Sequence, residues 1–316
     1  MRRYTKNILV LFLFLFYPIS AIGAEDRLIL GISIPSADHG WTGGVVWWAE
    51  KAIKEIQAAN PRLEVIFKQA VNHREQSYDI ENMLENNIQA LVILPHYPPP
   101  LANILRRVHN QGVFIITVDR TAPTLINDVY VAANNYEFGY MCGEYMARAS
   151  GGQGKLLVME GVPCDVNTLR VKGFRDAIAA FPAMTVMDSQ PAHWSEEKGY
   201  ELMQNYLAAF SQIDMIWCGD DDVLMGALAA YKQSGRQDVK MMLGGGGSKR
   251  VIEMIMAGDP LVPATVTYPP DMIYKAISMA SQRLIAGTEY DKEVIVPSQL
   301  ITKENAEQFY HPDSIY

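Results

Sequence analysis

The chain has 316 residues, of which 49% are hydrophobic and 20% are charged, a composition that excludes disordered, collagen-like and coiled-coil proteins. Its formal net charge of -8 argues against nucleic-acid and anionic-membrane partners, because phosphate groups are bound by clustered Lys and Arg. At this length two domains of ~130–150 residues are expected, with one large α/β domain as the alternative.

The first residues have the layout of a secretory signal peptide. Three cations precede an apolar run over residues 8–17, and a stretch of small residues, 20–24, follows it. The apolar run is about half as long as a membrane-spanning helix, so a permanent anchor is the weaker interpretation. We predict a signal peptide over residues 1–24, cleaved after Ala24 or Gly23, and therefore a periplasmic protein.

Cys142, Cys164 and Cys218 follow the predicted cleavage point, and their spacing fits no metal motif. An odd number in an oxidising compartment leaves at least one of them unpaired. We expect most of them to be small buried apolar residues. One disulfide is possible, and the sequence does not choose its pair.

From residue 28 onward, short aliphatic runs alternate with longer segments of helical period, a pattern typical of βαβ units and a parallel sheet. The predicted strands are residues 28–34, 63–69, 90–94, 113–118, 155–159, 184–190, 214–218, 240–243 and 264–268. The helical stretches between them include residues 42–59, 75–87, 136–149, 169–180, 196–210, 222–233 and 271–286.

The predicted strands fall into two groups of four or five, which the segment 129–154 separates. This grouping favours an α/β protein with two doubly wound lobes over one ten-stranded sheet. No low-complexity linker lies between the groups, so we expect short, ordered hinge crossings that couple the lobes as a clamp.

The residues that follow the strands form the candidate site, because ligands of open α/β sheets bind beyond the carboxyl ends of the strands. Aromatic rings stack on the C–H faces of a sugar, and Asp, Asn and Arg side chains bond its hydroxyls. This mixture indicates a small neutral polyhydroxylated ligand. The candidate residues are His39, Trp41, His96, Asp119, Arg120, Asn167, Arg170, Trp194, Asp220, Gly246 and Tyr268.

Several candidates also have a simpler structural interpretation. Trp41 could belong to the core, and Asp119–Arg120 could be a surface turn. The run Asp220–Asp222 could cap a helix, and capping is the preferred role for Asp221 and Asp222. Each histidine taken singly is more often an ordinary hydrogen-bonded residue than a ligand. The regular placement of the set after successive strands favours a binding site.

Four segments in both halves carry a family resemblance: Ile115–Arg120, Asn167–Phe174, Ser189–Trp194 and Gly226–Leu228. With them, the chain from Leu28 almost to its C-terminus resembles periplasmic sugar-binding proteins of the ribose-binding type, the substrate receptors of ABC importers. The resemblance implies the type I periplasmic binding protein fold, with two Rossmann-like lobes, three hinge crossings and the ligand in the cleft. The lobes implied are residues 25–133 plus 269–295 and residues 134–268 plus 296–316.

The resemblance also assigns roles to single residues. His39 and Trp41 take the places of a polar residue and a stacking aromatic in the family's first loop. Asp119–Arg120 matches the family's Asp-Arg pair, and Arg170 matches its second-lobe arginine. Trp194 stands where the family has the aromatic on the other face of the sugar.

The sequence departs from the family pattern at several positions. Asp220 stands where Asn is common, and Tyr268 where Gln is common. Gly246 replaces a family Asp, whose hydroxyl contacts Asp220 is expected to take over. Leu94 replaces a polar residue of the third loop, which leaves that side to His96 or Tyr97. The ligand is therefore open among pentoses, hexose variants, sugar alcohols and amino sugars.

The predicted function is capture of a small sugar or polyol and its delivery to an ABC transporter permease, by a monomer without cofactor or metal. The alternative is a sensor that presents its ligand to a chemoreceptor or sensor kinase. An enzyme is the rival class, although the sequence lacks nucleophile-elbow, zinc-protease and CxxC motifs. Asp119 with Asp220 could in principle form a glycosidase pair. A transcriptional repressor is excluded by the signal peptide and by the absence of a helix-turn-helix segment before Leu28.

Overall fold

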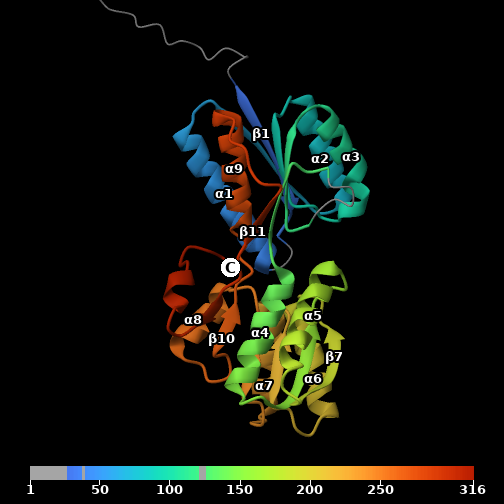
Figure 1. The fold of residues 1–316 in the computed structure, drawn as a ribbon, viewed down its shortest axis with the longest axis vertical. Coiled ribbons are helices and arrows are strands. Elements are labelled where there is room, and N and C mark those ends of the chain that lie inside the picture. Colours follow the sequence, from blue (N-terminus) through green and yellow to red (C-terminus); the bar gives the residue numbers. More distant parts are fainter. Residues whose placement is uncertain (1–26, 38–39, 121–125) are drawn as a thin grey trace, which may run out of the picture.

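The computed structural model describes residues 27–37, 40–120 and 126–316, which form two α/β lobes arranged end to end (Figure 1). The predicted signal peptide lies outside the described residues. Within the described ranges, no helix combines the length and the apolar character that crossing a membrane requires.

The N-terminal lobe is built on a parallel sheet in the order β11-β5-β4-β3-β1-β2. Its strands are β1 (Leu28–Pro35), β2 (Leu63–Ala70), β3 (Ala90–Ile93), β4 (Phe114–Val118), β5 (Val129–Ala133) and β11 (Glu293–Val296). Figure 1 shows α1 (Gly40–Ala59) and α9 (Met272–Ala286) on one side of this sheet, and α2 (His73–Glu85) and α3 (Pro98–Asn110) on the other.

Burial on both faces explains the continuous apolar strands of this lobe. On β3, Leu91 and Ile93 pack in a cluster with α2 and α3. Val92, between them, points to the other face and packs with the residues of α1 and α9. Since successive side chains of a strand face opposite sides, a sheet covered by helices on both sides selects apolar residues at every position.

The C-terminal lobe has a second parallel sheet in the order β7-β6-β8-β9. Its strands are β6 (Gln153–Glu160), β7 (Ala183–Pro191), β8 (Met215–Cys218) and β9 (Met241–Leu243). Its helices are α4 (Asn135–Ala149), α5 (Asp165–Ile178), α6 (Glu196–Ala209), α7 (Asp221–Ser234) and α8 (Lys249–Ala257). Beside them, β10 (Ala264–Val266) pairs antiparallel with β12 (Leu300–Thr302), which the 3₁₀ helix η2 (Ala306–Phe309) follows.

Glycines bring the helices of the C-terminal lobe into backbone contact. A Cβ atom on Gly139 of α4 would lie 1.9 Å from the carbonyl oxygen of Arg170 on α5, and one on Gly173 of α5 would lie 2.0 Å from that of Tyr136. Gly226 of α7 approaches the backbone of α6 in the same way. Because real Cβ atoms do not come this close, these positions admit only glycine without movement of a helix.

The nine predicted strands are all present, and each has the predicted bounds to within two residues at either end. The separation of the two strand groups by residues 129–154 was wrong, because β5 at Val129–Ala133 belongs to the first sheet and α4 follows it directly. Helix α3 was not predicted. It begins with Pro98–Pro100, and prolines are tolerated in a first turn, where no N–H is needed for the helix ladder.

The chain passes between the lobes after β5, after β10 and after β11. All three connections are short: α4 begins two residues after β5 ends, α9 begins six residues after β10 ends, and β12 begins four residues after β11 ends. The carboxyl ends of both parallel sheets therefore face the junction of the lobes, where the residues that follow the strands meet.

Candidate functional site

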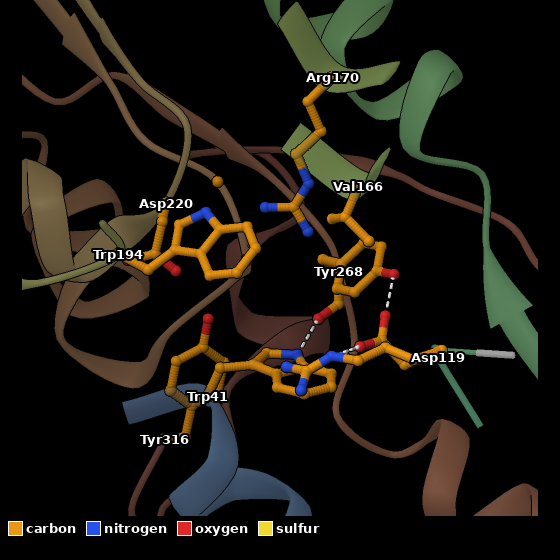
Figure 2. Close-up of a pocket in the computed structure, with 11 residues that line it drawn as sticks. Trp41, Asp119, Val166, Arg170, Trp194, Asp220, Tyr268 and Tyr316 are labelled. Atoms are coloured by element: carbon orange, nitrogen blue, oxygen red, sulfur yellow. Dashed lines mark hydrogen bonds and ion pairs between the residues drawn. The ribbon is translucent and has the colours of Figure 1, made fainter. Parts of the chain in front are cut away.

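A pocket that is partly open to solvent lies between the lobes (Figure 2). Most of its lining residues follow strand ends, as the sequence predicted. Eight of the eleven predicted site residues line it: Trp41, Asp119, Arg120, Arg170, Trp194, Asp220, Gly246 and Tyr268. Val166, Gly245 and Tyr316 complete the lining.

Arg170 supplies a buried guanidinium to the pocket from helix α5. Its Nε donates to Asn135 Oδ1 at 2.9 Å, and its Nη1 donates to the carbonyl oxygen of Gly219 at 2.8 Å. The rings of Phe138 and Tyr268 each lie with their centroid 4.3 Å from the guanidinium carbon. These hydrogen bonds and cation–π contacts fix the side chain, so its charge faces the pocket in one orientation.

Asp119 is buried and held by two neighbours on the other side of the pocket. The Tyr268 hydroxyl donates to Asp119 Oδ1 at 2.5 Å, and Arg120 Nε lies 3.3 Å from Asp119 Oδ2. Arg120 in turn donates to the backbone carbonyl of His96 at 3.0 Å. Burial, reinforced by the negative charge of Asp119, raises the pKa of Tyr268 well above its usual range, so the hydroxyl stays protonated and serves as a donor.

Two indole rings face the pocket from opposite lobes (Figure 2). Trp41, in the first turn of α1, donates from Nε1 to the carbonyl oxygen of Tyr268 at 2.9 Å. Trp194 lies in the loop between β7 and α6, and its indole occupies the space beside Gly161, where a Cβ atom would come within 2.0 Å of Nε1. Trp41 is thus both buried in the core and part of the pocket wall.

Asp119 and Trp194 adopt left-handed backbone conformations, with φ of 61° and 55°. Such conformations are unfavourable for residues other than glycine, above all for a large side chain such as tryptophan. They persist only where the surrounding structure imposes them, and they concentrate at functional sites. Here they turn a carboxylate and an indole into the pocket at the ends of β4 and β7.

The carboxylates of Asp220 and Asp222 have different roles. Asp220, not its neighbours, is the N-cap of α7: its Oδ1 accepts from the backbone N–H of Asp222 at 2.7 Å and of Val223 at 3.3 Å. Asp222 accepts from the backbone N–H of Gly40 at 2.9 Å, which links the two lobes. The capping role expected for Asp222 was therefore wrong, because its side chain points to the first turn of α1.

Asp221 is fully buried and does not cap α7 either. Its Oδ2 accepts from the backbone N–H groups of Gly247 and Ser248, at 3.0 and 2.7 Å, and its Oδ1 accepts from the Thr265 hydroxyl at 3.0 Å. Asp221 thereby holds the glycine-rich loop after β9 against β10. Burial outweighs these hydrogen bonds and raises its pKa to about 6.

This raised pKa predicts that the protein loses stability as the pH rises from about 4 to about 6. The folded state binds the Asp221 proton more tightly than the unfolded chain, whose Asp pKa is near 4. The resulting stabilisation is complete below about pH 4 and is lost as the pH passes the folded pKa. The difference corresponds to about 3 kcal/mol in the free energy of unfolding. Urea unfolding at pH 4.5 and pH 7 should detect about 2 kcal/mol of this difference.

Asp221→Asn should remove this pH dependence. The amide keeps one oxygen for the N–H groups of Gly247 and Ser248, and its NH₂ group can donate to the Thr265 hydroxyl. Asp165→Asn, on an exposed position in the first turn of α5, is the control and should keep the wild-type profile. Equal pH profiles for wild type and Asp221→Asn would contradict the assignment.

Two predicted site residues, His96 and Asn167, do not line the pocket, and the placement of a third is not described. His39 lies outside the described residues. His96 contributes to the site only through its backbone carbonyl, which accepts a hydrogen bond from Arg120. Asn167 is buried beneath the site, where it accepts from the backbone N–H of Gly161 at 2.7 Å and donates to Glu160 at 2.9 Å. Asn167 therefore shapes the turn after β6, because both ends of its amide are used by protein groups.

Three lining residues were missed by the sequence prediction. Val166 and Gly245 each lie one residue from a predicted site residue. Tyr316 follows no strand, so the rule on strand ends gave no signal for it.

Cys142 and Cys218 are buried free thiols and Cys164 is an exposed one. Across residues 27–37, 40–120 and 126–316, no three or more His, Cys, Asp or Glu side chains are grouped as metal ligands would be.

A family described as periplasmic binding protein domain matches residues 30–289. The chain belongs to the periplasmic binding proteins. This family consists of solute-binding receptors rather than enzymes, and membership implies a periplasmic location. The resemblance found in the sequence is confirmed.

Curated periplasmic binding proteins match nearly the whole chain. The ribose import binding protein of Bacillus subtilis is 26% identical over 284 residues, which cover 89% of this chain and 90% of that protein. The D-apiose import binding protein of Actinobacillus succinogenes is 29% identical over 287 residues, which cover 90% and 91% of the two chains.

Solved structures of periplasmic binding proteins share the fold. A solute-binding protein of Bacillus halodurans with bound myo-inositol has a TM-score of 0.77 at 24% identity and covers 93% of this chain and 100% of its own. One from Actinobacillus succinogenes with bound D-allose has a TM-score of 0.80 at 21% identity and covers 89% and 100%. The predicted fold class, two Rossmann-like α/β lobes of the type I arrangement, is confirmed.

Proposed function

We propose that the protein captures a small sugar or sugar alcohol between its lobes and delivers it to the permease of an ABC transporter. The observation that carries this proposal is the pocket itself, in which two opposed indoles flank buried charged groups of both signs. Flat apolar walls with a few fixed donors and acceptors suit a ring that has C–H faces and a rim of hydroxyls. Relatives named for ribose and D-apiose import support the same ligand class.

In this function each side chain of the pocket has a defined task. Trp41 and Trp194 stack against the two faces of the ring, one from each lobe. Arg170 donates to ring hydroxyls, while Asp119 and Asp220 accept from them. Because the site excludes water once closed, a ligand that lacks one of these hydroxyls leaves a buried group unpaired, at a cost of about 1–3 kcal/mol.

Closure of the lobes follows from the division of these contacts between them. A ligand that touches both lobes gains all its hydrogen bonds only when the lobes are together, and it therefore favours the closed state. The bond from Gly40 to Asp222 adds a direct contact between the lobes beside the pocket. We infer that the closed form, with surfaces of both lobes in a fixed relation, is what the permease recognises.

Catalysis is not part of this proposal. A glycosidase needs a pair of carboxyl groups that are available as acid and as base or nucleophile. Both oxygens of Asp119 are engaged, one by Tyr268 and the other by Arg120. Asp220 uses one oxygen to cap α7. We therefore infer a receptor that releases its ligand unchanged. We also infer that it is monomeric and is exported by a signal peptide over residues 1–24.

A thermal-shift screen tests the proposed ligand class. D-Ribose, D-apiose, D-allose and myo-inositol are the first compounds, followed by further pentoses, hexoses, polyols and amino sugars. A compound at 100 times its Kd stabilises the protein by about 2.7 kcal/mol, which should raise the Tm by about 4–5 °C for a chain of this length. Mass spectrometry of the recovered compound is the control for catalysis. No shift with any of these compounds, or a chemically altered compound, would contradict the proposal.

A further inference from the structure

Tyr316 reaches the pocket from the segment that follows η2. Both lobes hold this segment in place. The His311 ring packs edge-on against Trp48 of α1, with centroids 5.1 Å apart. On the other side, Lys249 of α8 donates to the backbone carbonyls of Pro312 and Ser314. The position of Tyr316 is therefore set by contacts outside the pocket.

Two glycines provide the space for the Tyr316 side chain. A Cβ atom on Gly44 of α1 would lie 2.8 Å from Tyr316 Cβ, and one on Gly246, after β9, would lie 2.1 Å from the Tyr316 hydroxyl oxygen. The ring thus sits between the N-terminal lobe and the glycine-rich loop of the C-terminal lobe. Figure 2 shows its hydroxyl directed toward the part of the pocket that contains Asp220 and Trp194.

The Tyr316 hydroxyl is buried and has no hydrogen-bond partner among the described residues. Tyr268, on the opposite wall, differs in this respect, because its hydroxyl donates to Asp119 and accepts from Asn135. A buried hydroxyl without a partner is unfavourable and rare in folded proteins. Since this hydroxyl faces a pocket, a bound molecule can satisfy it.

Asp220 offers an acceptor on the same side of the pocket. Its Oδ1 accepts hydrogen bonds from two backbone N–H groups at the N-terminus of α7. Among the described residues, none donates a hydrogen bond to its Oδ2. A ligand hydroxyl carries one donor and can also accept. One such group placed between Tyr316 and Asp220 would satisfy both side chains at once.

We propose that Tyr316 is a specificity-determining residue, whose hydroxyl donates a hydrogen bond to a ligand hydroxyl that in turn donates to Asp220. This inference rests on the proposed function, since it concerns the same pocket. It adds a requirement to the ligand: a hydroxyl must lie at the edge of the ring that points toward Tyr316. A ring without a hydroxyl there would bind weakly even if all its other contacts were kept.

Isothermal titration calorimetry of Tyr316→Phe tests the inference. The variant keeps the ring, the contacts with Gly44 and the shape of the pocket, and removes only the hydroxyl. The probes are D-ribose, D-apiose, D-allose and myo-inositol. For each probe that binds the wild-type protein, we expect affinity to fall about tenfold. The matched control is Tyr310→Phe, because the Tyr310 hydroxyl bonds Glu253 outside the pocket, at 2.9 Å.

Two further measurements separate recognition from a structural role. The Tm of ligand-free Tyr316→Phe should stay at or above that of the wild type, since the lost hydroxyl has no protein partner. One monodeoxy analogue of the tightest-binding probe, the one that lacks the hydroxyl bonded by Tyr316, should bind the wild-type protein about tenfold more weakly than the probe does. Tyr316→Phe should not weaken the binding of this analogue any further.

The outcomes distinguish the two levels of the proposal. Wild-type affinity of Tyr316→Phe for every probe that binds would overturn the role of Tyr316 and leave the proposed function standing. A lowered Tm together with a uniform loss for all analogues would also overturn it, in favour of a structural role. If neither the four probes nor any other compound of the thermal-shift screen binds the wild-type protein, the proposed ligand class is wrong and this inference fails with it.

Discussion

Arg170→Ala is expected to reduce the affinity for the bound sugar more than 100-fold and to lower the free energy of unfolding by about 2–5 kcal/mol. The guanidinium is the buried cation of the pocket, and its loss leaves ligand hydroxyls without their donor. It also leaves Asn135 Oδ1 and the Gly219 carbonyl without the hydrogen bonds they now accept. The rest of the core is untouched, so the fold should remain.

Calorimetry and urea unfolding check the two parts of this result. Arg170→Lys keeps the charge but cannot make both hydrogen bonds, and it should recover only a fraction of the affinity. Arg175→Ala, on an exposed position of the same helix, is the control for the loss of an arginine from α5 and should bind as the wild type does. Wild-type affinity of Arg170→Ala would remove Arg170 from the site.

Gly139→Ala should destabilise the protein by about 3 kcal/mol or more and weaken ligand binding as well. The new Cβ atom would lie 1.9 Å from the backbone oxygen of Arg170, and a backbone atom cannot move away as the end of a side chain can. Helix α5 would have to shift, and the Arg170 guanidinium would shift with it. Intrinsic helix propensity predicts the opposite sign, since Ala is favoured over Gly in a helix by about 1 kcal/mol.

The sign of this change therefore separates close helix packing from local propensity. Chemical denaturation measures the stability, and calorimetry with the tightest-binding compound of the screen measures the affinity. Gly219→Ala, at a position outside the helices, is a control for the added methyl group alone, because its Cβ atom would have its nearest neighbours at an ordinary 3.6 Å. A Gly139→Ala variant as stable as the wild type would show that α4 and α5 are not held at this distance.

Local pattern was sufficient for most strands that are covered on both faces, although β5, which is also buried, was not predicted. Residues 90–94 and 113–118 are nearly continuous apolar runs, and both are central strands of the first sheet. The short strands β11 and β12 were missed, because their partly exposed residues alternate without a strong signal. The assignment of β5 to the first sheet depends on pairing with β4 and β11, which sequence periodicity does not contain.

Most of the candidate site could be predicted because of one topological rule. Parallel strands bring their carboxyl ends to one edge, so Asp119, Trp194 and Asp220 meet although the sequence separates them widely. The same rule included Asn167, which is next in sequence to the pocket residue Val166 but whose side-chain amide forms hydrogen bonds with Gly161 and Glu160. Position after a strand brings a residue to the site, whereas the direction of its side chain depends on local backbone geometry.

The alternation of strands and helices, the two lobes and the residue types at the strand ends follow from short-range periodicity and from the topology it implies. Only the tertiary structure decided which carboxylate of Asp220–Asp222 caps a helix, holds a loop or links the lobes. It alone placed Tyr316 in the pocket. The physical reason is that these roles depend on contacts between segments far apart in the chain, whose partners and directions are fixed only when the lobes pack together.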